Sequence, residues 1–557
     1  MKQVGGCCAV LLLATLGLNA AGPQVALIAA IKAGQSQTIR ELLGKRAPDV
    51  NLAEPDGTTP LHWAVELDDV ATVDLLIQAG ANVKAINRYG VTPLWVACAN
   101  GSPSMVGRLL RAGADVNGAS ADGETPLMVA SHTGNVDAIQ ALLNRGADVN
   151  ARESRKGQTA LMWAAAEGHA DAIDLLVTVG ARVNDRSKGG QAGGRRARAI
   201  FDVYEDQPTG GAAGTARTDP ALLWGADTPY VNLQRANSGT AARLMGSATP
   251  PPPGFTPLLF AARAGHPAAI KALAKAGANV NDTAVNGTPA LVMAVQNAHY
   301  DAAVALLESG ANPNADDQGW TALHQLVMTR RPNTGRYPPN PVRTGAVSDL
   351  QLLKALVARG ADVNARMKKE PVFANDRNVM NRIGATPFLL AAKAVDVGMM
   401  RALVEVGANP LFTTDEGATP LMAAAGVGIW RAGENPGNPE EALAAGKLAW
   451  ELGGDVNAVD ANGDTAIHGA VHRGADRLIE FLVSKGANPD VRNKIGWTPL
   501  TIAEGVFYPN VYFPGFPDTA GVLRSLGAKD SGKRRPEDYL NTLDRQRAGT
   551  KSPRKPL

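Results

Sequence analysis

The chain has 557 residues, of which 45% are hydrophobic and 19% are charged, and its formal net charge is +3. So small a net charge gives no reason to expect binding to nucleic acid or to an anionic membrane surface. A chain of this length would ordinarily form several globular domains, unless it carries an internal repeat.

The N-terminus is typical of the secretory signal of an exported bacterial protein. Lys2 precedes an apolar run from Ala9 to Leu18, and small residues follow, so cleavage is expected after Ala20 or Ala21. The run is too short for a membrane-spanning helix, which needs ~20 residues. The alternative is a buried first helix of the folded protein. We expect a signal peptide over residues 1–21 and a periplasmic or secreted mature chain with no integral membrane segment.

An internal repeat governs the rest of the chain. Signals similar to Thr-Pro-Leu recur, most often with the step that leads from Thr59 to Thr92, and each is followed by a glycine. In eight of eleven copies, the marker and its glycine are as far apart as Thr59 and Gly80, which indicates one repeated structural unit. The markers are Thr59, Thr92, Thr125, Thr159, Thr256, Pro289, Thr321, Thr386, Thr419, Thr465 and Thr498.

One copy shows what each unit should be. Thr59 suits an N-cap and Pro60 the first position of a helix over "LHWAVELD". "VATVDLLIQAG" predicts a second helix, which Gly80 can end in the left-handed conformation. Two helices of this length cannot bury their apolar sides alone, so each copy must stack on its neighbours.

At this point a family resemblance emerges. "DGTTPLHWAVELDDVATVDLLIQAGANV" and "DGETPLMVASHTGNVDAIQALLNRGADVNAR" resemble ankyrin repeats, and about twelve copies extend from Gln24 to Asp530. The resemblance implies an all-α ankyrin-repeat solenoid of stacked helix-turn-helix units with extended turns, interrupted by insertions. It also implies a scaffold that binds a protein partner through its concave face.

The longest departure from the period follows Gly180, because the next marker comes only at Thr256. The ends of this insertion are rich in Gly and Ala, and it carries aromatic residues inside. Two interpretations stay open: a flexible linker that splits the array, and an ordered flap over the concave face. We expect repeats over 22–188, this insertion over 189–253, further repeats over 254–530 and a basic disordered tail over 531–557, with the repeats in two stacks.

Four shorter insertions follow. One lies in the extended turn between Gly360 and Thr386. Three others lie between the two helices of a copy, after Thr321, Thr419 and Thr498, and become shorter in that order. The last is rich in aromatic residues and can be read either as a cap on the apolar end of the stack or as a ligand site.

All eight histidines fall into three slots of the repeat. They lie three residues after the marker (His62, His324, His468), seven after (His132, His472) or ten after (His169, His266, His299). Catalytic residues are placed once per site, whereas frame residues recur, so we predict that His62 is a hydrogen-bonding strut. Motifs for zinc, haem, phosphate or a catalytic serine are absent. We therefore predict no catalytic residue, no metal site and no cofactor.

Candidate partner-binding residues come from the turns. In proteins that this chain resembles, the residue before the marker threonine typically faces the concave groove. Phe255, Trp320 and Trp497 are large apolar groups at that position, and Arg88 and Tyr89 lie on a neighbouring turn tip. Exposed aromatic residues are typical interface anchors, so these five are predicted to bind the partner. The alternative for Phe255 and Trp320 is packing beneath the insertions.

The predicted function is a non-catalytic scaffold for an unidentified protein partner, with no nucleic acid expected. Three alternatives remain: an accessory or guard subunit of an exported redox or degradative enzyme, an enzyme with its site within residues 189–253, and a secreted effector.

Overall fold

The structure, a computed structural model, describes residues 23–44, 49–188, 254–331, 341–369, 380–429, 436–494, 496–508, 511–513 and 515–529. The predicted signal peptide, the 189–253 insertion and the 531–557 tail lie outside these residues. The chain divides into two compact units, unit 1 up to Val285 and unit 2 from Asn286 onward. None of the helices in the described ranges is long and apolar enough to cross a membrane.

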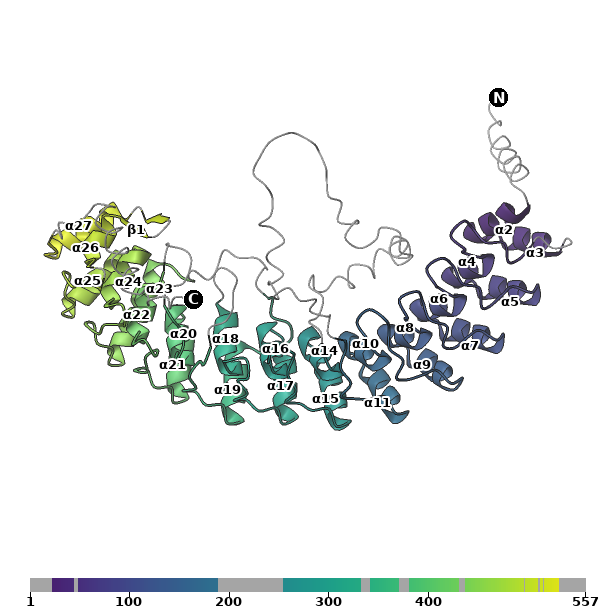
Figure 1. Cartoon of the computed structure of the whole chain (residues 1–557), viewed down its shortest axis with the longest axis horizontal. Helices are drawn as coiled ribbons and strands as arrows, with labels where there is room; N and C mark the ends of the chain where they lie inside the picture. Colours follow the sequence, from purple (N-terminus) through teal and green to yellow (C-terminus); the bar gives the residue numbers. More distant parts are fainter. Residues whose placement is uncertain are drawn as a thin grey trace, which may run out of the picture. The chain divides into compact units, whose positions relative to one another are not determined.

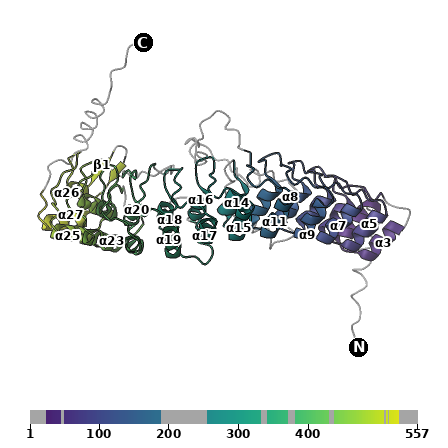
Figure 2. The ribbon, with the colours of Figure 1, turned by 90° about the horizontal axis from the view of Figure 1, so that it is seen from below.

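Unit 1 is a stack of helical hairpins (Figure 1). The first helices of its hairpins are α2 (Pro23–Lys32), α4 (Pro60–Glu66), α6 (Pro93–Ala99), α8 (Pro126–Thr133), α10 (Ala160–Glu167) and α14 (Pro257–Ala264). The second helices are α3 (Ser36–Gly44), α5 (Val70–Gln78), α7 (Pro103–Arg111), α9 (Val136–Leu143), α11 (Ala170–Thr178) and α15 (Pro267–Lys275). First helices pack on first helices, and most second helices pack on second helices, so the core lies between two layers. Figure 1 shows the two rows of helices, and Figure 2 shows the same stack from below.

Unit 2 repeats this arrangement. Its first helices are α16 (Ala290–Gln296), α18 (Ala322–Arg330), α20 (Pro387–Lys393), α22 (Pro420–Ala425), α24 (Ala466–Arg473) and α26 (Pro499–Ala503). Its second helices are α17 (Tyr300–Glu308), α19 (Asp349–Ala358), α21 (Val397–Glu405), α23 (Pro439–Glu451), α25 (Asp476–Ser484) and α27 (Pro517–Ser525). The predicted all-α solenoid of stacked hairpins is confirmed. One addition was not predicted: β1 (Val506–Tyr508) and β2 (Val511–Phe513) form an antiparallel hairpin in the last insertion.

Local sequence explains how each hairpin begins and ends. Thr59 is the N-cap of α4, its hydroxyl accepts the backbone N–H of His62, and Pro60 opens the helix. Gly80, after α5, has a φ of 87°, the left-handed conformation that only glycine adopts without strain. Val73 and Leu76 are fully buried between the layers, and each such side chain contributes ~1.5–3 kcal/mol by leaving water. The predictions for this copy are confirmed.

The long insertion does not divide the stack, contrary to the expected arrangement in two stacks. Helix α14 packs on α10, and α15 packs on α11. The backbone N–H of Ser187 donates to the carbonyl oxygen of Phe255 (2.9 Å), and that of Phe255 donates to Ser187 Oγ (2.9 Å). Asn87 and Val91 make the same two bonds in a regular turn. The insertion therefore extends the tip of one turn, and the bonds that close the turn are kept.

Candidate partner-binding surfaces

The histidine three residues after the N-cap joins neighbouring hairpins. His62 Nε2 lies 3.1 Å from the carbonyl oxygen of Val91 in the next hairpin, and Nδ1 lies 3.2 Å from the backbone N of Thr59. Because a carbonyl oxygen only accepts, Nε2 donates and Nδ1 accepts, so the ring is neutral. Both ring nitrogens are used within the frame. His62 is the structural strut that its recurrence predicted.

The same bonds recur in unit 2. His324 Nε2 donates to the carbonyl oxygen of Ala385 (3.1 Å), and His468 Nε2 donates to that of Trp497 (3.2 Å). Burial lowers the pKa of both histidines to about 4, against the opposing effect of these backbone bonds. Two neutral, enclosed rings with both nitrogens engaged are poor candidates for a general base.

A ladder of asparagines in the extended turns also connects the hairpins, and sequence analysis missed it. Asn117 Nδ2 donates to the carbonyl oxygen of Gly146 (3.1 Å), and its Oδ1 accepts the backbone N–H of Asp148 (2.9 Å). The same pair of bonds is made by Asn51, Asn150, Asn184, Asn314, Asn364 and Asn457. The sequence did contain a signal for this ladder, because an asparagine recurs at the end of the "ADVN"-like turns.

Two of the five predicted partner-binding residues are not accessible. Phe255 is fully buried, with its ring 5.5 Å from that of Phe260 in an edge-to-face arrangement. Trp497 is only 8% exposed, and its backbone is bonded to Asn493 and to His468. The expectation that these positions are partly exposed is wrong for both residues. Hydrogen bonds keep both turns closed, within the turn for Phe255 and also to His468 of the previous repeat for Trp497, and the large apolar side chain is covered.

The other three predicted residues remain accessible. Arg88 is exposed, and its guanidinium lies 4.7 Å over the half-buried ring of Tyr89, whose hydroxyl it also contacts. Trp320 is half-buried in unit 2, and its Nε1 donates to Gln325 Oε1 (2.9 Å). The structure thus brings Arg88 and Tyr89 together on one turn tip of unit 1. Phe255 and Trp497 are too buried to contribute to a binding site with them.

The first helices of unit 1 carry two half-buried tryptophans that sequence analysis did not select. Trp63 and Trp163 each lie four residues after an N-cap threonine, in α4 and α10. In both hairpins, a polar side chain from the preceding first helix lies on the indole: Lys32 on Trp63, and His132 on Trp163. Their shared repeat position was visible in the sequence, but their exposure was not.

Comparison with known families settles what these hairpins are. The model for three copies of the ankyrin repeat matches residues 6–87, 26–120, 94–187, 234–317 and 258–337, and the single-repeat model matches residues 462–494. Together these matches cover more than half of the chain. The chain belongs to the ankyrin repeat family.

Several curated proteins share similar ankyrin repeats. The human Ankyrin repeat and SOCS box protein 16 is 27% identical over 257 residues, which are 46% of this chain and 48% of that protein. The E3 ubiquitin-protein ligase KEG of Arabidopsis thaliana is 30% identical over 297 residues, 45% of this chain and 18% of the relative. The human Neurogenic locus notch homolog protein 1 is 33% identical over 267 residues, which are 45% of this chain and 7% of that protein. The chain spans about half or less of the length of these relatives.

A groove runs between the extended turns of three successive ankyrin repeats in unit 2. Its volume is about 710 Å³, and it lies beside Thr321, the residue after Trp320. Ion pairs line it, Lys368 with Asp316 at 2.6 Å and Arg366 with Asp415 at 2.7 Å. A lining with charges of both signs suits a polar protein segment better than an apolar small molecule.

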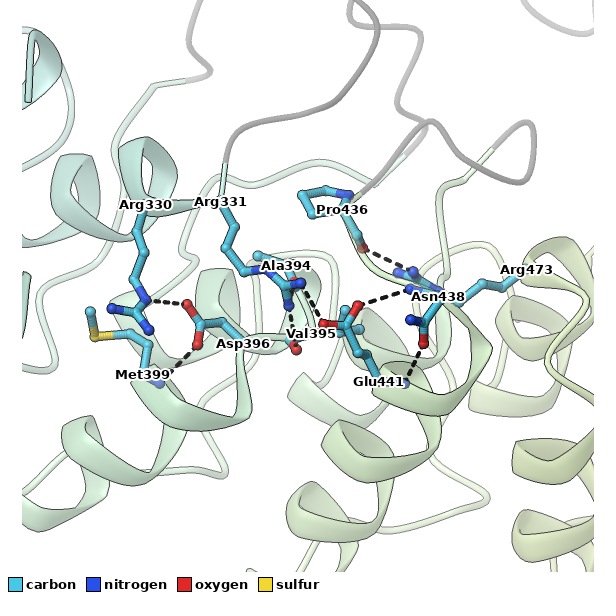
Figure 3. A network of polar contacts seen from close by, with 10 residues as sticks. All are labelled: Arg330, Arg331, Ala394, Val395, Asp396, Met399, Pro436, Asn438, Glu441 and Arg473. Carbon is cyan, nitrogen blue, oxygen red and sulfur yellow. Dashed lines mark hydrogen bonds and ion pairs between the residues drawn. The ribbon is translucent and has the colours of Figure 1, made fainter. Parts of the chain in front are cut away.

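A network of arginines and carboxylates lies at the other end of α18, where the ankyrin repeats carry insertions (Figure 3). Arg330 Nε donates to Asp396 Oδ2 (2.6 Å), and Arg330 also pairs with Asp349. Asp396 Oδ1 accepts the backbone N–H of Met399 (3.0 Å) and so caps α21. Asp396 is only 6% exposed. The guanidinium and the cap together stabilise its carboxylate.

Arg331 extends this network to the next repeat. It donates to the carbonyl oxygens of Ala394 (3.3 Å) and Val395 (3.0 Å) and to Glu441 Oε1 (2.6 Å), as Figure 3 shows. Glu441 Oε2 accepts the backbone N–H of Asn438 (3.0 Å), which completes a capping box at the start of α23. The residues line a cavity of about 450 Å³. Because the charged groups already pair with one another, this region is better suited to joining repeats than to holding a ligand.

Proposed function

We propose that this ankyrin-repeat chain is a non-catalytic scaffold that binds a protein partner through its first helices and extended turns. The observation that carries the proposal is the partial exposure of Trp163, on a first helix that otherwise buries its large apolar side chains, and of Trp320 in an extended turn. Tryptophan is enriched among the residues that dominate binding energy. The surface is preformed by stacked hairpins, which keeps the ordering cost of binding low.

Membership of the ankyrin repeat family supports a binding role. The non-catalytic part of the proposal rests on the histidines three residues after the N-cap, whose ring nitrogens are engaged in hydrogen bonds that join the repeats. We extend the family assignment to all twelve hairpins, including those over residues 338–461 that the matches do not reach. They share the capping threonines and the asparagine ladder, as Thr386 and Asn364 illustrate. Export is also part of the proposal, and N-terminal sequencing of the mature protein should find a start at position 21 or 22.

Affinity capture from the exported fraction tests the binding role. The double variant Trp163→Ala with Trp320→Ala should retain the partner at least ~10-fold less than the wild type, because interface tryptophans commonly contribute more than ~1.4 kcal/mol each. Trp450→Ala is the matched control, since Trp450 lies on the second-helix layer, edge-to-face with Phe481 at 5.6 Å. Circular dichroism should show that all three proteins fold.

If every captured protein stays with the double variant, the proposed surface is wrong. A haem or metal enzyme among the proteins lost would favour the role of an accessory subunit.

A further inference from the structure

Unit 1 contains its own example of a lysine bound by a tryptophan and a carboxylate. Lys32 Nζ lies 3.9 Å from the centroid of the Trp63 ring and 2.7 Å from Glu54 Oε1. The other oxygen of Glu54 accepts the indole N–H of Trp63 (2.8 Å). The cation thus interacts with the ring face and with the carboxylate at once, each of which attracts it.

The same repeat position recurs at Trp163, with a different neighbour. The side chain from the preceding first helix is here His132, whose ring meets the indole edge-on at 5.3 Å and 79°. Glu167 lies one helical turn after Trp163, on the same face of α10. Its side chain is 41% exposed. His132 thus contacts both the Trp163 ring and the accessible carboxylate of Glu167, which brings the two groups together around one side chain.

At this second position the cationic partner in the ion pair is a histidine, which carries no permanent charge. Among the described residues, the ion-pair partner of Glu167 is His132, with Nδ1 3.4 Å from Oε1. Burial lowers the pKa of His132; Glu167 opposes this effect, and the neighbouring His169 adds to it. The imidazole is therefore largely neutral near pH 7. Glu167 is thus paired with a largely neutral ring, whereas Glu54 is paired with the permanent cation of Lys32.

We propose, on the basis of the protein-binding role above, that Trp163 and Glu167 form a recognition site for a lysine or arginine side chain of the partner. The incoming cation lies against the indole and pairs with Glu167, as Lys32 does with Trp63 and Glu54. The complementarity of charge selects a basic segment over an acidic or purely apolar one.

Fluorine NMR of the full chain labelled with 5-fluorotryptophan tests this site directly. The probes are three pentapeptides, Ac-Gly-Gly-X-Gly-Gly-amide, in which X is lysine, arginine or norleucine. Trp163→Phe assigns the signal. The lysine and arginine peptides should shift the Trp163 signal saturably, with a dissociation constant on the order of millimolar, while norleucine should not. Glu167→Gln should weaken binding ~5-fold or more.

Two further variants sharpen the test. Asp174→Asn removes one exposed charge from the second helix of the same hairpin and should leave peptide binding unchanged. Lys32→Met removes the ammonium group that lies against Trp63 and Glu54. The cationic peptides should then shift the Trp63 signal, which they do not shift in the wild type.

The proposal fails if norleucine acts as lysine does, or if Glu167→Gln has no effect. It also fails if Trp163 responds only after residues 189–253 are shortened, because the occupant would then be this chain itself. If the cationic peptides bind Trp163 but capture finds no partner, the proposed function fails and the recognition site stands. If a partner is captured but its binding does not change in Glu167→Gln, the proposed function stands and the recognition site fails.

Discussion

Units 1 and 2 share one frame but hold the joints between their helices differently. In unit 1, asparagine and histidine side chains tie the short turn between the two helices of a hairpin to the preceding repeat. Asn100 Nδ2 donates to the carbonyl oxygen of Val65 (2.9 Å), and His169 Nε2 donates to that of His132 (2.9 Å). In unit 2, where insertions lengthen some of these joints, arginines make such bonds: Arg331 donates to carbonyl oxygens of the following repeat, and Arg473 donates to that of Pro436 in the preceding one. The longer connection is thus held by side chains of longer reach.

The arginine joints come with an electrostatic cost that unit 1 avoids. Arg473 is only 6% exposed, and its Nη1 donates to the carbonyl oxygen of Pro436 (3.1 Å). Burial lowers its pKa to about 10, an effect that nearby Glu441 opposes. Because the nearby charge of Glu441 offsets this buried guanidinium, unit 2 should respond more strongly to changes of packing, pH and charge.

The largest expected difference concerns two helical glycines. A Cβ at Gly469 would lie 2.4 Å from the backbone N of Val427, so Gly469→Ala must push α24 away from α22 and should cost ~3 kcal/mol. At Gly107 of α7, the nearest atom would be Arg111 Nη1 at 3.5 Å. Gly107→Ala should therefore stabilise unit 1 by up to ~1 kcal/mol through helix propensity. Hydrogen exchange of peptides from α24 and α7 measures the change in local stability for the two variants. If Gly469→Ala leaves the exchange of α24 unchanged, α24 and α22 can move apart without loss of stability.

Acid should affect unit 2 before unit 1. The pKa of His468 is lowered to about 4 by burial, below the ~6.5 expected for the unfolded chain. Its contribution is complete above pH ~6.5 and is lost as the pH falls toward ~4, by ~2 kcal/mol. In unit 1, burial also lowers the pKa of His62, but burial and Asp122 raise the pKa of Glu124 to about 7, so there acid also removes an unfavourable charge.

His468→Gln checks this pH dependence, because glutamine can donate a hydrogen bond but does not titrate. Hydrogen exchange of α24 should rise more steeply between pH ~6.5 and ~4 in the wild type than in the variant, after correction for intrinsic rates. Equal slopes would mean that this histidine does not set the acid sensitivity of unit 2.

A smaller contrast should come from two ion pairs. Arg330→Met leaves the buried Asp396 with only its backbone partner and should destabilise unit 2 by ~1.5 kcal/mol, a value discounted for the partial exposure of Arg330. Arg108→Met breaks the pair with Asp74 in unit 1, whose side chains are 33% and 40% exposed, and should cost ~0.5 kcal/mol. Urea unfolding followed by hydrogen exchange compares them. If both variants lose the same free energy of unfolding, the arginine ion pairs contribute no more to the stability of unit 2 than the surface pair contributes to unit 1.

Local rules made much of the fold predictable. Thr59, Pro60 and Gly80 follow the chemistry of helix ends, which a short window of sequence contains. His62 was assigned correctly because frame residues recur with the frame. Phe255 could not be placed this way, since its burial depends on a neighbouring repeat from which the long insertion separates it in the sequence. The ion pair of Arg330 and Asp396 could not be predicted, because the two residues lie 66 positions apart and the repeat period does not relate them.

The bonds between Ser187 and Phe255 have a consequence for how such a chain can grow. They close a span of 68 positions with the geometry that a regular turn uses for four. Because closing a flexible loop becomes only ~0.6 kcal/mol less favourable with each doubling of its length, a foreign segment placed here adds little entropic burden. The tip of this turn is therefore a place where evolution, or a protein engineer, can graft new sequence without rebuilding the stack.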